Sequence, residues 1–374
     1  MSNNVETDSW GTILVTGGGG FLGSHIVEAF AAMPKVHQVI MTGRNRKKSR
    51  KYIPKVKFEL CDITDFDKTK EILARFQPKV IIHTISPGPF ATKEIQLEVN
   101  YAATKHLLEA AKQDAGVQAF IYTSSIEACS SALGHISSPL REDEARVNNL
   151  KSKDYWYCRT KGAADTLVRE ANSPKPNGAK DWGDYLLTVC LRTPGLYGPR
   201  DSTIVPAMLA MVNTAGARMQ YGPDTTVHEW LYIENAVLAH VLATRKLLGD
   251  PHGVCGEAFF ITDGTPMKFH QFTRAIFKEA GDRNMNSQNP KFIVIPFWLL
   301  FPLLAVWEWV YRIATLCRKW PYVSRQNFLY IRKGIRISIE KSRERLGYEP
   351  KVTTEEGICR TVAWFKRNGA KKLN

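Results

Sequence analysis

The sequence of 374 residues lacks the features that mark disulfide-stapled, zinc-binding and nucleic-acid-binding proteins. Its seven cysteines contain no C-x-x-C pair, and their odd number favours a reducing compartment over a disulfide framework. Zinc-finger spacing, a recognition helix and an aromatic-plus-basic RNA motif are all missing, so we expect no nucleic-acid partner and predict no metal site. Residues 1–10 are polar and acidic and do not form a signal peptide, and we expect them to be disordered.

Acidic residues are outnumbered by basic ones, which gives a formal net charge of +15. Basic residues concentrate in Arg44–Arg50 and in the C-terminal region. With nucleic acid disfavoured, this distribution suits an anionic membrane surface or an acidic substrate. Hydrophobic residues make up 44% of the chain, which is enough for a large core. The length indicates one large domain, or a main domain with a smaller lobe.

Gly17, Gly20 and Gly23 form a glycine-rich run directly after the predicted strand Ile13–Thr16. Glycines at this spacing allow a tight strand-to-helix turn, the approach of a pyrophosphate and close packing of the helix on the strand. A P-loop would need a lysine before its serine, whereas Ser24 follows Gly23 directly, so a nucleoside triphosphatase is disfavoured. We predict a dinucleotide-binding turn, and the alternative is a glycine turn without a ligand. The expected cofactor contacts in this turn are Gly17, Gly20, Phe21, Leu22 and Gly23.

The next predicted strand, Gln38–Thr42, is followed by Gly43 and Arg44. An acidic residue at this position binds the 2′-hydroxyl of NAD, whereas an arginine suits the 2′-phosphate of NADP because its planar fork matches a phosphate. Arg44 therefore favours NADP as the cofactor, with NAD as the alternative. A solvated basic loop without a ligand also explains a charge run of this kind.

Asp62 and Ile63 follow the third predicted strand, Lys57–Glu59. The carboxyl ends of parallel strands share one edge of the sheet, so these residues are expected near the adenine of the cofactor. The alternative role for Asp62 is to cap the next helix, for which Thr64 or Asp65 is the better candidate.

Apolar runs alternate with helical patterns in the first half of the chain, which is typical of a doubly wound parallel sheet. The predicted strands are Ile13–Thr16, Gln38–Thr42, Lys57–Glu59, Val80–His83, Ala119–Thr123 and Leu187–Leu191. The predicted helices include Leu22–Ala32, Phe66–Phe76 and Glu94–Lys112. We therefore predict an α/β Rossmann core over residues 11–195. Residues 196–370 are expected to form a smaller substrate-binding lobe that is interleaved with the core.

Tyr157 and Lys161 are four residues apart, so both would lie on one face of a helix. A tyrosine ordinarily titrates near pH ~10, and a neighbouring ammonium group lowers its pKa, which makes the phenol a better proton acceptor. Lys161 would also hold the nicotinamide ribose. Ser125, at the end of the fifth strand, would donate a hydrogen bond to the reacting oxygen, and its alternative role is a helix cap. A Tyr–Lys pair at this spacing is also common on protein surfaces, so this prediction depends on the surrounding fold.

Six segments carry a resemblance to a known family: Phe120–Glu127, Val99–Thr104, Leu191–Pro199, Trp230–Ala236, Gly256–Asp263 and Arg345–Pro350. The chain resembles the 3β-hydroxysteroid dehydrogenase/isomerase family of the extended short-chain dehydrogenases, and within it the decarboxylating sterol-4α-carboxylate 3-dehydrogenases. The similarity spans about residues 11 to 367. It implies a catalytic tetrad of Asn100, Ser125, Tyr157 and Lys161, in which Asn100 holds a proton-relay water near Lys161. It also implies that Pro194 borders the nicotinamide.

The activity that this resemblance implies is the NAD(P)-dependent oxidation of a secondary alcohol, at C3 of a sterol, steroid or terpenoid. A carboxylate on C4 would make the product a β-keto acid, which loses carbon dioxide without a further catalytic group. The same site would reduce a ketone in reverse. Gly43 and Arg44 replace the acidic residue that is typical of NAD-using sterol members. The alternatives are a nucleotide-sugar epimerase or dehydratase and a non-catalytic NADP-binding protein, and a homodimer stays open.

The segment from Phe292 to Trp307 is almost continuously apolar, although two prolines interrupt it and Glu308 closes it. A spanning helix needs about 20 apolar residues, and an extension to residue 316 would bury a carboxylate. The alternative is a buried or substrate-covering helix of a soluble fold. We predict that residues 292–316 associate with the membrane interface, because amphipathic aromatic side chains favour headgroup depth. These aromatic residues are Trp298, Trp307, Trp309, Tyr311 and Trp320.

The predicted membrane segment also has basic neighbours, since Arg312, Arg318 and Lys319 would meet anionic lipid. Residues 371–374 fit the di-lysine signal that returns membrane proteins to the endoplasmic reticulum. Together with a hydrophobic substrate, these features predict a protein on the cytosolic face of the endoplasmic reticulum membrane. A soluble cytoplasmic protein is the alternative.

Overall fold

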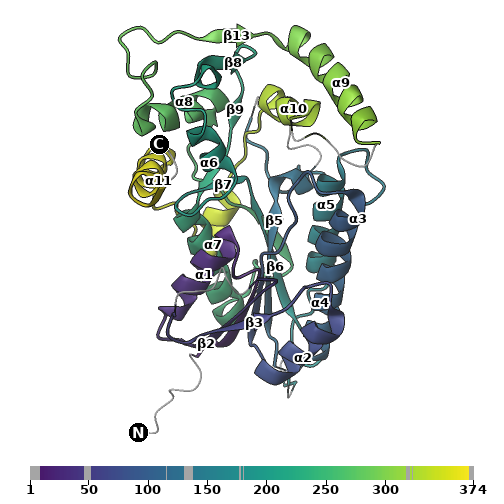
Figure 1. The fold of residues 1–374 in the computed structure, drawn as a ribbon. Helices are drawn as coiled ribbons and strands as arrows, with labels where there is room; N and C mark the ends of the chain where they lie inside the picture. Colours follow the sequence, from purple (N-terminus) through teal and green to yellow (C-terminus); the bar gives the residue numbers. More distant parts are fainter. Residues whose placement is uncertain are drawn as a thin grey trace.

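The computed structural model describes residues 9–45, 52–114, 116–129, 138–176, 178–179, 181–316, 321 and 323–369. The strands of the main sheet are β1 (Gly11–Thr16), β2 (Val36–Gly43), β3 (Val56–Leu60), β4 (Val80–His83), β5 (Ala119–Ser125), β6 (Leu187–Thr193) and β11 (Glu257–Phe260). Within the described residues they form a seven-stranded sheet in the order β11-β6-β5-β4-β1-β2-β3, and every neighbouring pair is parallel (Figure 1). The chain order reverses between β1 and β4, the point at which open α/β sheets bind their ligands.

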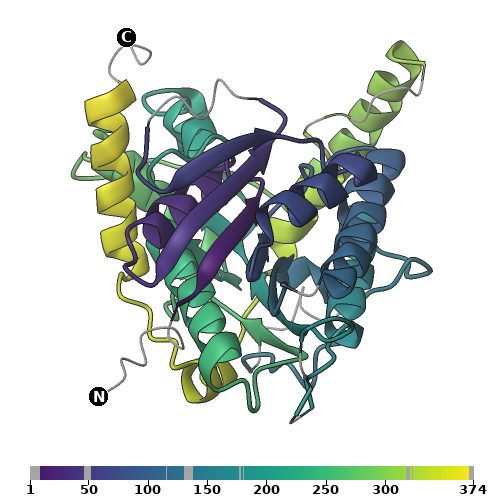
Figure 2. The ribbon, with the colours of Figure 1, turned by 90° about the horizontal axis from the view of Figure 1, so that it is seen from below.

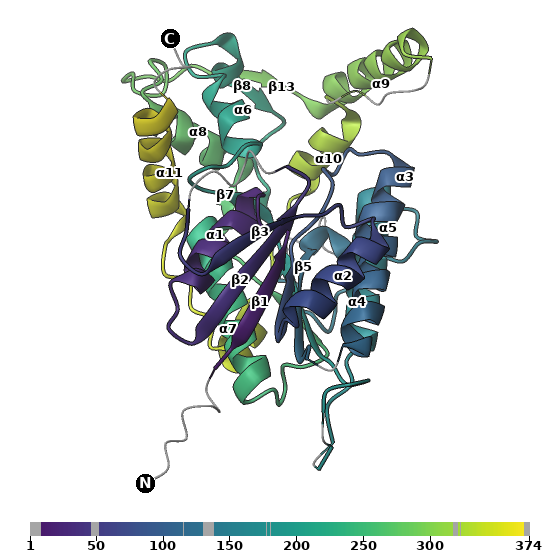
Figure 3. The same ribbon diagram turned by 60° about the horizontal axis from the view of Figure 1, so that its bottom comes forward.

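Helices cover both faces of this sheet. The helices of one face are α1 (Phe21–Ala31) and α7 (Ile233–Gly249), and those of the other are α2 (Phe66–Phe76), α4 (Ala103–Gln113) and α5 (Trp156–Glu170) (Figure 3). Seen from below, the strands lie between the two helical layers (Figure 2). Because side chains alternate along a strand, Ile13 and Val15 of β1 pack in the core under α1 and α7, whereas Leu14 packs in the core on the opposite face.

The predicted doubly wound α/β fold is confirmed by this topology. All six predicted strands are present, and β5 and β6 each run two residues further than predicted, to Ser125 and Thr193. The residues of these extensions are polar and buried, and their side chains find hydrogen-bond partners at the end of the sheet. The seventh strand, β11, is not among the predicted strands because it lies beyond residue 195, where the alternating pattern becomes irregular.

Residues beyond 195 contribute both to the sheet and to a lobe above its carboxyl end (Figure 1). α7 and β11 join the core, and the other elements pack above it. These elements are β7 (Gly195–Tyr197), α6 (Ile204–Leu209), β8 (Met219–Tyr221), β9 (Val227–His228), β10 (Trp230–Tyr232), β12 (Met267–Lys268), α8 (Phe269–Ala280), β13 (Ile293–Ile295), α9 (Phe297–Ala314), α10 (Arg325–Lys333) and α11 (Thr354–Gly369). Shorter helical turns lie at Ala215–Arg218 and Ser342–Leu346.

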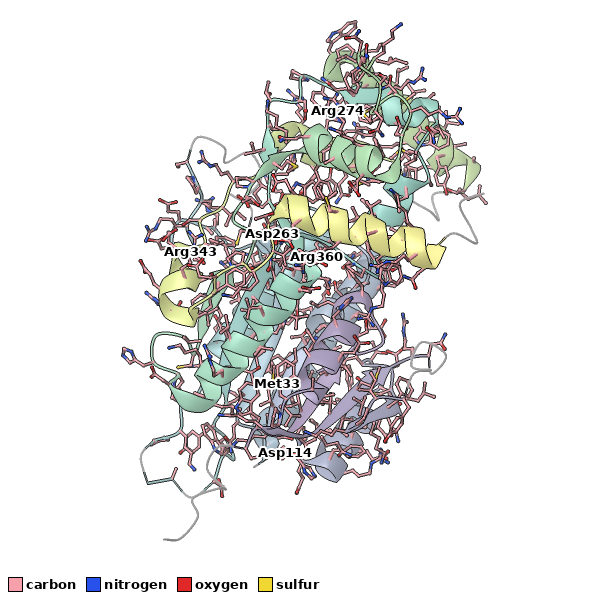
Figure 4. The ribbon with its side chains drawn as sticks, turned by 90° about the vertical axis from the view of Figure 1, so that its left-hand side faces the viewer. Met33, Asp114, Asp263, Arg274, Arg343 and Arg360 are labelled. Atoms are coloured by element: carbon pink, nitrogen blue, oxygen red, sulfur yellow. The ribbon has the colours of Figure 1, made fainter. Side chains whose placement is uncertain are left out.

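A buried carboxylate fixes the lower part of the lobe. Asp263 accepts hydrogen bonds from the backbone N–H of Tyr232 (2.8 Å), from Asn235 Nδ2 (2.7 Å) and from Tyr197 Oη (3.0 Å). Burial raises the pKa of Asp263 to about 6. Figure 4 shows Asp263 beside α11. These contacts hold β7, β10 and α7 together directly above the sheet.

α9 extends away from the sheet at the upper edge of the lobe (Figures 1 and 3). Its apolar side chains are largely exposed, with Trp298 at 76% and Trp309 at 67%. By length and composition, α9 is the one helix among the described residues that is suited to crossing a membrane. Only 17% of the helix is buried, so it is not a buried helix of the core, and the alternative that it covers the substrate stays a prediction.

Several sequence predictions fall outside the described residues. They concern residues 1–8 of the predicted disordered start, the greater part of Arg44–Arg50, the membrane-segment residues Arg318, Lys319 and Trp320, and the di-lysine tail 371–374.

Candidate active site

The glycine turn after β1 has the shape that a pyrophosphate requires. Gly17 adopts a φ of +74°, in the left-handed region that favours glycine. A Cβ on Gly23 would collide with the Gly17 carbonyl, so α1 packs against the turn only because position 23 is glycine. Gly20, the N-cap of α1, is exposed, and a Cβ there would meet only the Gly17 carbonyl, at 3.1 Å. The first amides of α1 are therefore open to an anion, and the turn fits the pyrophosphate of a dinucleotide.

The residues predicted at the adenosine end of the cofactor lie close together. Arg44, with its side chain 79% exposed after β2, has Nη1 3.9 Å from Asp62 Oδ2. Asp62 Oδ1 accepts hydrogen bonds from the backbone N–H (3.1 Å) and hydroxyl (2.9 Å) of Thr64. Asp65 is the residue that caps α2, which leaves the second oxygen of Asp62 available at the strand edge. Ile63 is packed in the core, so only its backbone is placed to contact a cofactor.

Lys161 lies on the buried face of α5, with its ammonium group directed at the end of β5. Its Nζ donates hydrogen bonds to Tyr122 Oη (3.2 Å) and to the carbonyl of Thr123 (3.0 Å). Burial lowers the pKa of Lys161 to about 7, although the carboxylate of Asp165 opposes this shift. Lys161 can therefore bind or release a proton near neutral pH.

Tyr157 lies one turn before Lys161 on α5, and the hydroxyl side chains of Ser125 and Ser86 are near enough to act on its pKa. Burial, followed by the negative charge of Glu127, raises the pKa of Tyr157 above its ordinary value, and the hydroxyls of Ser125 and Ser86 oppose this in part. The prediction that Lys161 lowers the pKa of Tyr157 is wrong, because this pKa is raised. The reason is that the Lys161 ammonium is held by groups at the end of β5 and not by the Tyr157 hydroxyl.

The helix predicted over Glu94–Lys112 is divided into three parts: α3 (Lys93–Gln96), a π-helical turn (Leu97–Ala102) and α4. Hydrophobic periodicity does not reveal the extra residue that such a turn inserts, so the sequence predicts a single helix. π-helical turns are frequent at functional sites. Asn100 lies in this turn and is fully buried.

Asn100 connects two parts of the site. Its Oδ1 accepts a hydrogen bond from Ser86 Oγ (3.0 Å), and its Nδ2 donates to Thr160 Oγ1 (3.3 Å). Because the Ser86 hydroxyl also lowers the pKa of Tyr157, it lies between Asn100 and the phenol. Thr160 directly precedes Lys161 in α5. A water held between Asn100 and Lys161 stays a prediction.

A buried ion pair behind the site fixes α5 against the sheet. Arg192 of β6 donates from Nε (3.0 Å) and Nη2 (2.7 Å) to the carboxylate of Asp165 on α5, and Ser124 Oγ donates to the same carboxylate at 2.7 Å. Although burial acts in the opposite direction, the Arg192 guanidinium helps to hold the pKa of Asp165 below its ordinary value. Since Tyr157 and Lys161 are on the same helix, this pair sets their distance from β5.

Three further predicted contacts lie at the same edge of the sheet. Phe21 and Leu22 are the first two residues of α1, directly after the glycine turn. Pro194 is buried between β6 and β7. Their contacts with a cofactor stay predictions.

Ser86, Tyr122 and Glu127 belong to the site but are absent from the sequence-based set. Ser86 follows β4, Tyr122 lies within β5, and Glu127 comes two residues after Ser125. The rule that selects Ser125, namely that polar residues at the carboxyl ends of strands face the ligand, also selects Ser86 and Glu127. Tyr122 carries no such signal, because its position reads as a core residue of a buried strand.

The two hydroxyls of Ser125 and Tyr157 can act on one oxygen atom. An alcohol oxygen placed between them would accept a hydrogen bond from Ser125 and give its proton to Tyr157. Ser125 also accepts a hydrogen bond from the backbone N–H of Glu127 (3.1 Å), so it serves as a helix cap as well. This arrangement would suit proton transfer, and it lies at the same carboxyl edge of the sheet as the glycine turn.

Comparison with known proteins agrees with this geometry. The 3-beta hydroxysteroid dehydrogenase/isomerase family model matches residues 14–291. The decarboxylating sterol-4-alpha-carboxylate 3-dehydrogenase of Gibberella zeae is 33% identical over 314 residues, which cover 82% of this chain and 98% of that protein. The human enzyme of the same name is 29% identical over 361 residues, which cover 94% of this chain and 87% of that protein.

Solved structures share the fold. A UDP-glucose 4-epimerase from Thermotoga maritima, solved with UDP-glucose, superimposes with a TM-score of 0.67 and 21% identity, covering 96% of this chain and 99% of that one. A dTDP-glucose 4,6-dehydratase from Bacillus anthracis, solved with NAD, gives a TM-score of 0.67 and 18% identity, covering 97% of this chain and 99% of that one. At these identities the likeness shows the fold alone. The match to the family model over most of the chain shows that this protein belongs to the 3-beta hydroxysteroid dehydrogenase/isomerase family.

Proposed function

We propose that this oxidoreductase uses NAD(P) to oxidise the 3-hydroxyl of a sterol or related terpenoid. The observation that carries the proposal is the packing of α5, which carries Tyr157 and Lys161 one helical turn apart, against the end of β5 at Ser125. Membership of a hydroxysteroid dehydrogenase family and the glycine turn that fits a pyrophosphate support it. The relatives that share most of the chain are named as 3-dehydrogenases of sterol carboxylates.

In this proposal, each side chain of the site has a separate task. Ser125 donates a hydrogen bond to the carbinol oxygen and holds it beside Tyr157, which takes the hydroxyl proton. Lys161 and the turn at Gly20 would hold the dinucleotide, which supplies the hydride acceptor when bound. Asn100 is hydrogen-bonded to Ser86 and to Thr160 of α5. It would hold the water through which the proton taken up by Tyr157 reaches Lys161.

We propose further that the substrate carries a carboxylate on C4, next to the carbinol carbon. Oxidation at C3 then gives a β-keto acid. When the C4–carboxylate bond breaks, its electron pair enters the C3–C4 bond as an enolate, and carbon dioxide leaves. The names of the decarboxylating relatives support this step.

Arg44 is the basis for proposing NADP over NAD. Its guanidinium lies at the edge of β2 and contacts Asp62 only at 3.9 Å, so it can turn toward a phosphate without losing a close partner. Gly43 places no carboxylate at this position.

We also propose that α9 rests on a membrane and does not cross it. A helix of 18 residues is about 27 Å long, close to the thickness of a hydrocarbon core. However, Glu308 lies within it, and Arg325 of α10 binds this carboxylate through its backbone N–H (2.5 Å) and Nε (2.7 Å). A spanning helix would have to break this pair and bury the charge. The exposed side chains of Trp298 and Trp309 suit the headgroup region.

A groove of about 670 Å³ lies between α9 and α10 and reaches Tyr155, the N-cap of α5. Its lining includes Phe301, Pro302 and Leu329. Tyr155 is the residue before α5, so the groove runs from the membrane-facing helix to the N-terminal end of the helix that carries Tyr157. We propose it as the entry path of the apolar substrate. The placement on the endoplasmic reticulum and a homodimer stay predictions.

The test supplies purified protein with NADP⁺ or NAD⁺ and a 3-hydroxysterol 4-carboxylate in lipid vesicles. The expected result is a 3-ketone that has lost carbon dioxide, with one reduced nicotinamide formed per ketone. Tyr157→Phe should abolish both products, and Tyr185→Phe, a change on a loop before β6, should leave them unchanged. Conversion of a UDP-sugar without net cofactor reduction would contradict the proposal and favour an epimerase.

A further inference from the structure

Tyr122 binds the lysine of the site, although its place within β5 reads as that of a core residue. The Lys161 ammonium donates to Tyr122 Oη (3.2 Å) and to the Thr123 carbonyl (3.0 Å), and both the lysine and the tyrosine are buried. The ammonium nitrogen also lies 4.8 Å from the centre of the Tyr122 ring, within the range of a cation–π contact. Among the described residues, no other hydrogen-bond acceptor of this nitrogen is found, so these two groups hold it in place.

The ring of Tyr122 is itself fixed by a buried histidine. His83, at the end of β4, stacks on it with the ring centres 5.6 Å apart and the planes at 23°. Thr104 Oγ1 donates to the Asn100 carbonyl (2.8 Å), so it accepts from His83 Nε2 at 3.1 Å. His83 Nδ1 is then left to accept from Thr16 Oγ1 at 2.6 Å, at the end of β1. The stack therefore ties Tyr122 to the strand before the glycine turn and to the π-helical turn.

The ionisable groups that face Lys161 come from three strands and from its own helix. They are His83 of β4, Tyr122 of β5, Cys190 of β6 and Asp165 of α5. Burial lowers the pKa of His83 to about 3 and raises the pKa values of Tyr122 and Cys190 well above their ordinary values. Only Asp165 is therefore charged near neutral pH, and the other three groups stay neutral while Lys161 titrates.

The two partners of Lys161 differ in what they can bind. A carbonyl oxygen only accepts hydrogen bonds, so Thr123 can bind an N–H of the lysine but not the lone pair of its neutral amine. A phenol both accepts and donates, so Tyr122 can accept from the ammonium and donate its O–H to the amine. Because Tyr122 keeps its proton while Lys161 titrates, both arrangements are open to the same pair of atoms.

We propose that Tyr122 is the positioning residue of Lys161 and holds its nitrogen at the end of β5 in both protonation states. The ammonium donates to Tyr122 Oη, and after the lysine has released its proton the Tyr122 hydroxyl turns and donates to the amine. No heavy atom has to move in this exchange. The inference rests on the proposed function in one respect, because a lysine that receives the proton of the reaction changes its protonation state in each turnover. Without the Tyr122 hydroxyl, the neutral amine would lose the donor that holds it.

NMR of lysine labelled with ¹³C at Cε tests this contact in the cofactor-free protein. The signal that Lys161→Met removes is that of Lys161, and it should titrate near pH 7, because burial lowers its pKa to about this value. Tyr122→Phe keeps the ring and its stack on His83, and the midpoint should fall by about one pH unit, since a hydrogen bond to a charged group is stronger than one to a neutral group. Tyr348→Phe is the matched control: this buried hydroxyl donates to the Thr262 carbonyl (2.9 Å), and its loss should leave the midpoint unchanged.

Reduction of a 3-keto sterol with NADPH or NADH separates positioning from a purely structural role. At pH 5.5 most of the lysine is charged in both proteins and Thr123 still binds it, so Tyr122→Phe should work within about threefold of the wild-type kcat. At pH 9 the neutral amine has lost its donor, and kcat should be about tenfold lower than in wild type, as expected for one hydrogen bond. A loss of equal size at both pH values, or an unchanged NMR midpoint, would overturn the role of Tyr122.

A fluorinated tyrosine keeps the test decisive if Tyr122→Phe does not fold. 3-Fluorotyrosine at position 122 retains the hydroxyl but makes it a poorer acceptor and a better donor. Both changes disfavour the ammonium, so the midpoint of Lys161 should again fall, and an unchanged midpoint would overturn the inference. A wild-type protein that reduces no 3-keto sterol would contradict the proposed function, whereas the NMR titration would still decide whether Tyr122 holds the lysine.

Discussion

The carboxyl end of the sheet and α9 place side chains in opposite kinds of surroundings. At the end of the sheet, ionisable side chains such as Lys161 and Asp165 are buried. On α9, tryptophans such as Trp298 and Trp309 are exposed. Both arrangements are unfavourable for an isolated protein in water. Buried charges lose their hydration, and exposed apolar side chains order the surrounding water.

The difference lies in how each region is compensated. Buried polar groups at the sheet end have protein partners: Asp165 binds Arg192, Lys161 binds Tyr122, and Asn100 binds Ser86. The exposed face of α9 has no such internal partner among the described residues, and a contiguous apolar patch of this kind marks an interaction surface. The first region is therefore complete within the chain, whereas the second requires a neighbour of low polarity. Substitutions should separate the two: changes at the sheet end should affect catalysis or folding, and changes on α9 should affect only membrane contact.

Loss of the reacting phenol should give the largest effect. Tyr157→Phe removes the proton acceptor while retaining the ring, and should lower kcat by roughly 10³-fold, within the usual range for general acid–base catalysis. The dissociation constant of NADP should change little, because the glycine turn is untouched. Stopped-flow absorbance and fluorescence titration measure the two quantities. An unchanged kcat would remove Tyr157 from the mechanism.

Loss of the buried cation behind the site should chiefly affect folding. Arg192→Met leaves the carboxylate of Asp165 buried without its main partner and should lower the free energy of unfolding by about 3–5 kcal/mol. The double variant with Asp165→Leu should recover most of this loss, since the one cation left without its carboxylate, Arg169, is partly exposed to solvent. Urea unfolding followed by circular dichroism gives both values. A single variant as stable as wild type would mean that the pair does not hold α5 in place.

Loss of the basic side chain after β2 should alter cofactor choice without altering chemistry. Arg44→Ala removes one charge-assisted contact to the 2′-phosphate and should weaken NADP binding by about 10- to 100-fold. NAD binding should be nearly unchanged. Isothermal titration with each dinucleotide measures the ratio. Equal weakening for both cofactors would assign Arg44 to the shared part of the dinucleotide and contradict the NADP preference.

Charges on α9 should separate membrane contact from catalysis. A double variant, Trp298→Glu and Trp309→Glu, should lower vesicle binding by at least about tenfold, because two large apolar side chains leave the interface. Its melting temperature should match that of wild type, as both side chains are exposed in the free protein. Tyr52→Glu, at an equally exposed aromatic residue after β2, is the matched control for added charge. Vesicle flotation would contradict the account if the double variant bound as tightly as the control.

The pH dependence of oxidation should reveal the charge of Glu127. The pKa of Tyr157 is raised, so the rate, which needs the ionised phenol, should keep rising beyond pH 10. E127Q removes a negative charge that raises this pKa, and its profile should shift to lower pH. Below pH 7 the two profiles should converge, because Glu127 has a pKa of about 7 and is protonated there. Superimposable profiles across the range would mean that Glu127 carries no charge near the phenol.

Much of the fold could be predicted from the sequence, and the reasons are local. Val80–His83 and Phe66–Phe76 are observed with the predicted bounds, because a fully buried strand and a strongly amphipathic helix both leave clear patterns. The π-helical turn around Asn100 could not be predicted, since one inserted residue leaves the apolar pattern intact. β11 was missed because its place in the sheet depends on pairing with the distant β6.

The candidate site could also be predicted only in part, for the same reason. Gly17, Gly20 and Gly23 could be predicted because their conformations follow from a short motif. The partners of Tyr157 and Lys161 could not, because they come from separate strands and their distances are set by tertiary packing. For this reason the sequence assigns Lys161 to the phenol, whereas the structure directs its ammonium to Tyr122.

The most direct test of the central claim follows the hydrogen atom on the carbinol carbon. A 3-hydroxysterol labelled with deuterium at C3 is supplied with NADP⁺ or NAD⁺ and wild-type protein in vesicles, and the reduced nicotinamide is analysed by mass spectrometry. The account predicts that the reduced cofactor accumulates with the deuterium in it, and that Tyr157→Phe abolishes this transfer. Retention of the label in the alcohol, together with turnover of a nucleotide sugar and no accumulation of reduced cofactor, would contradict it.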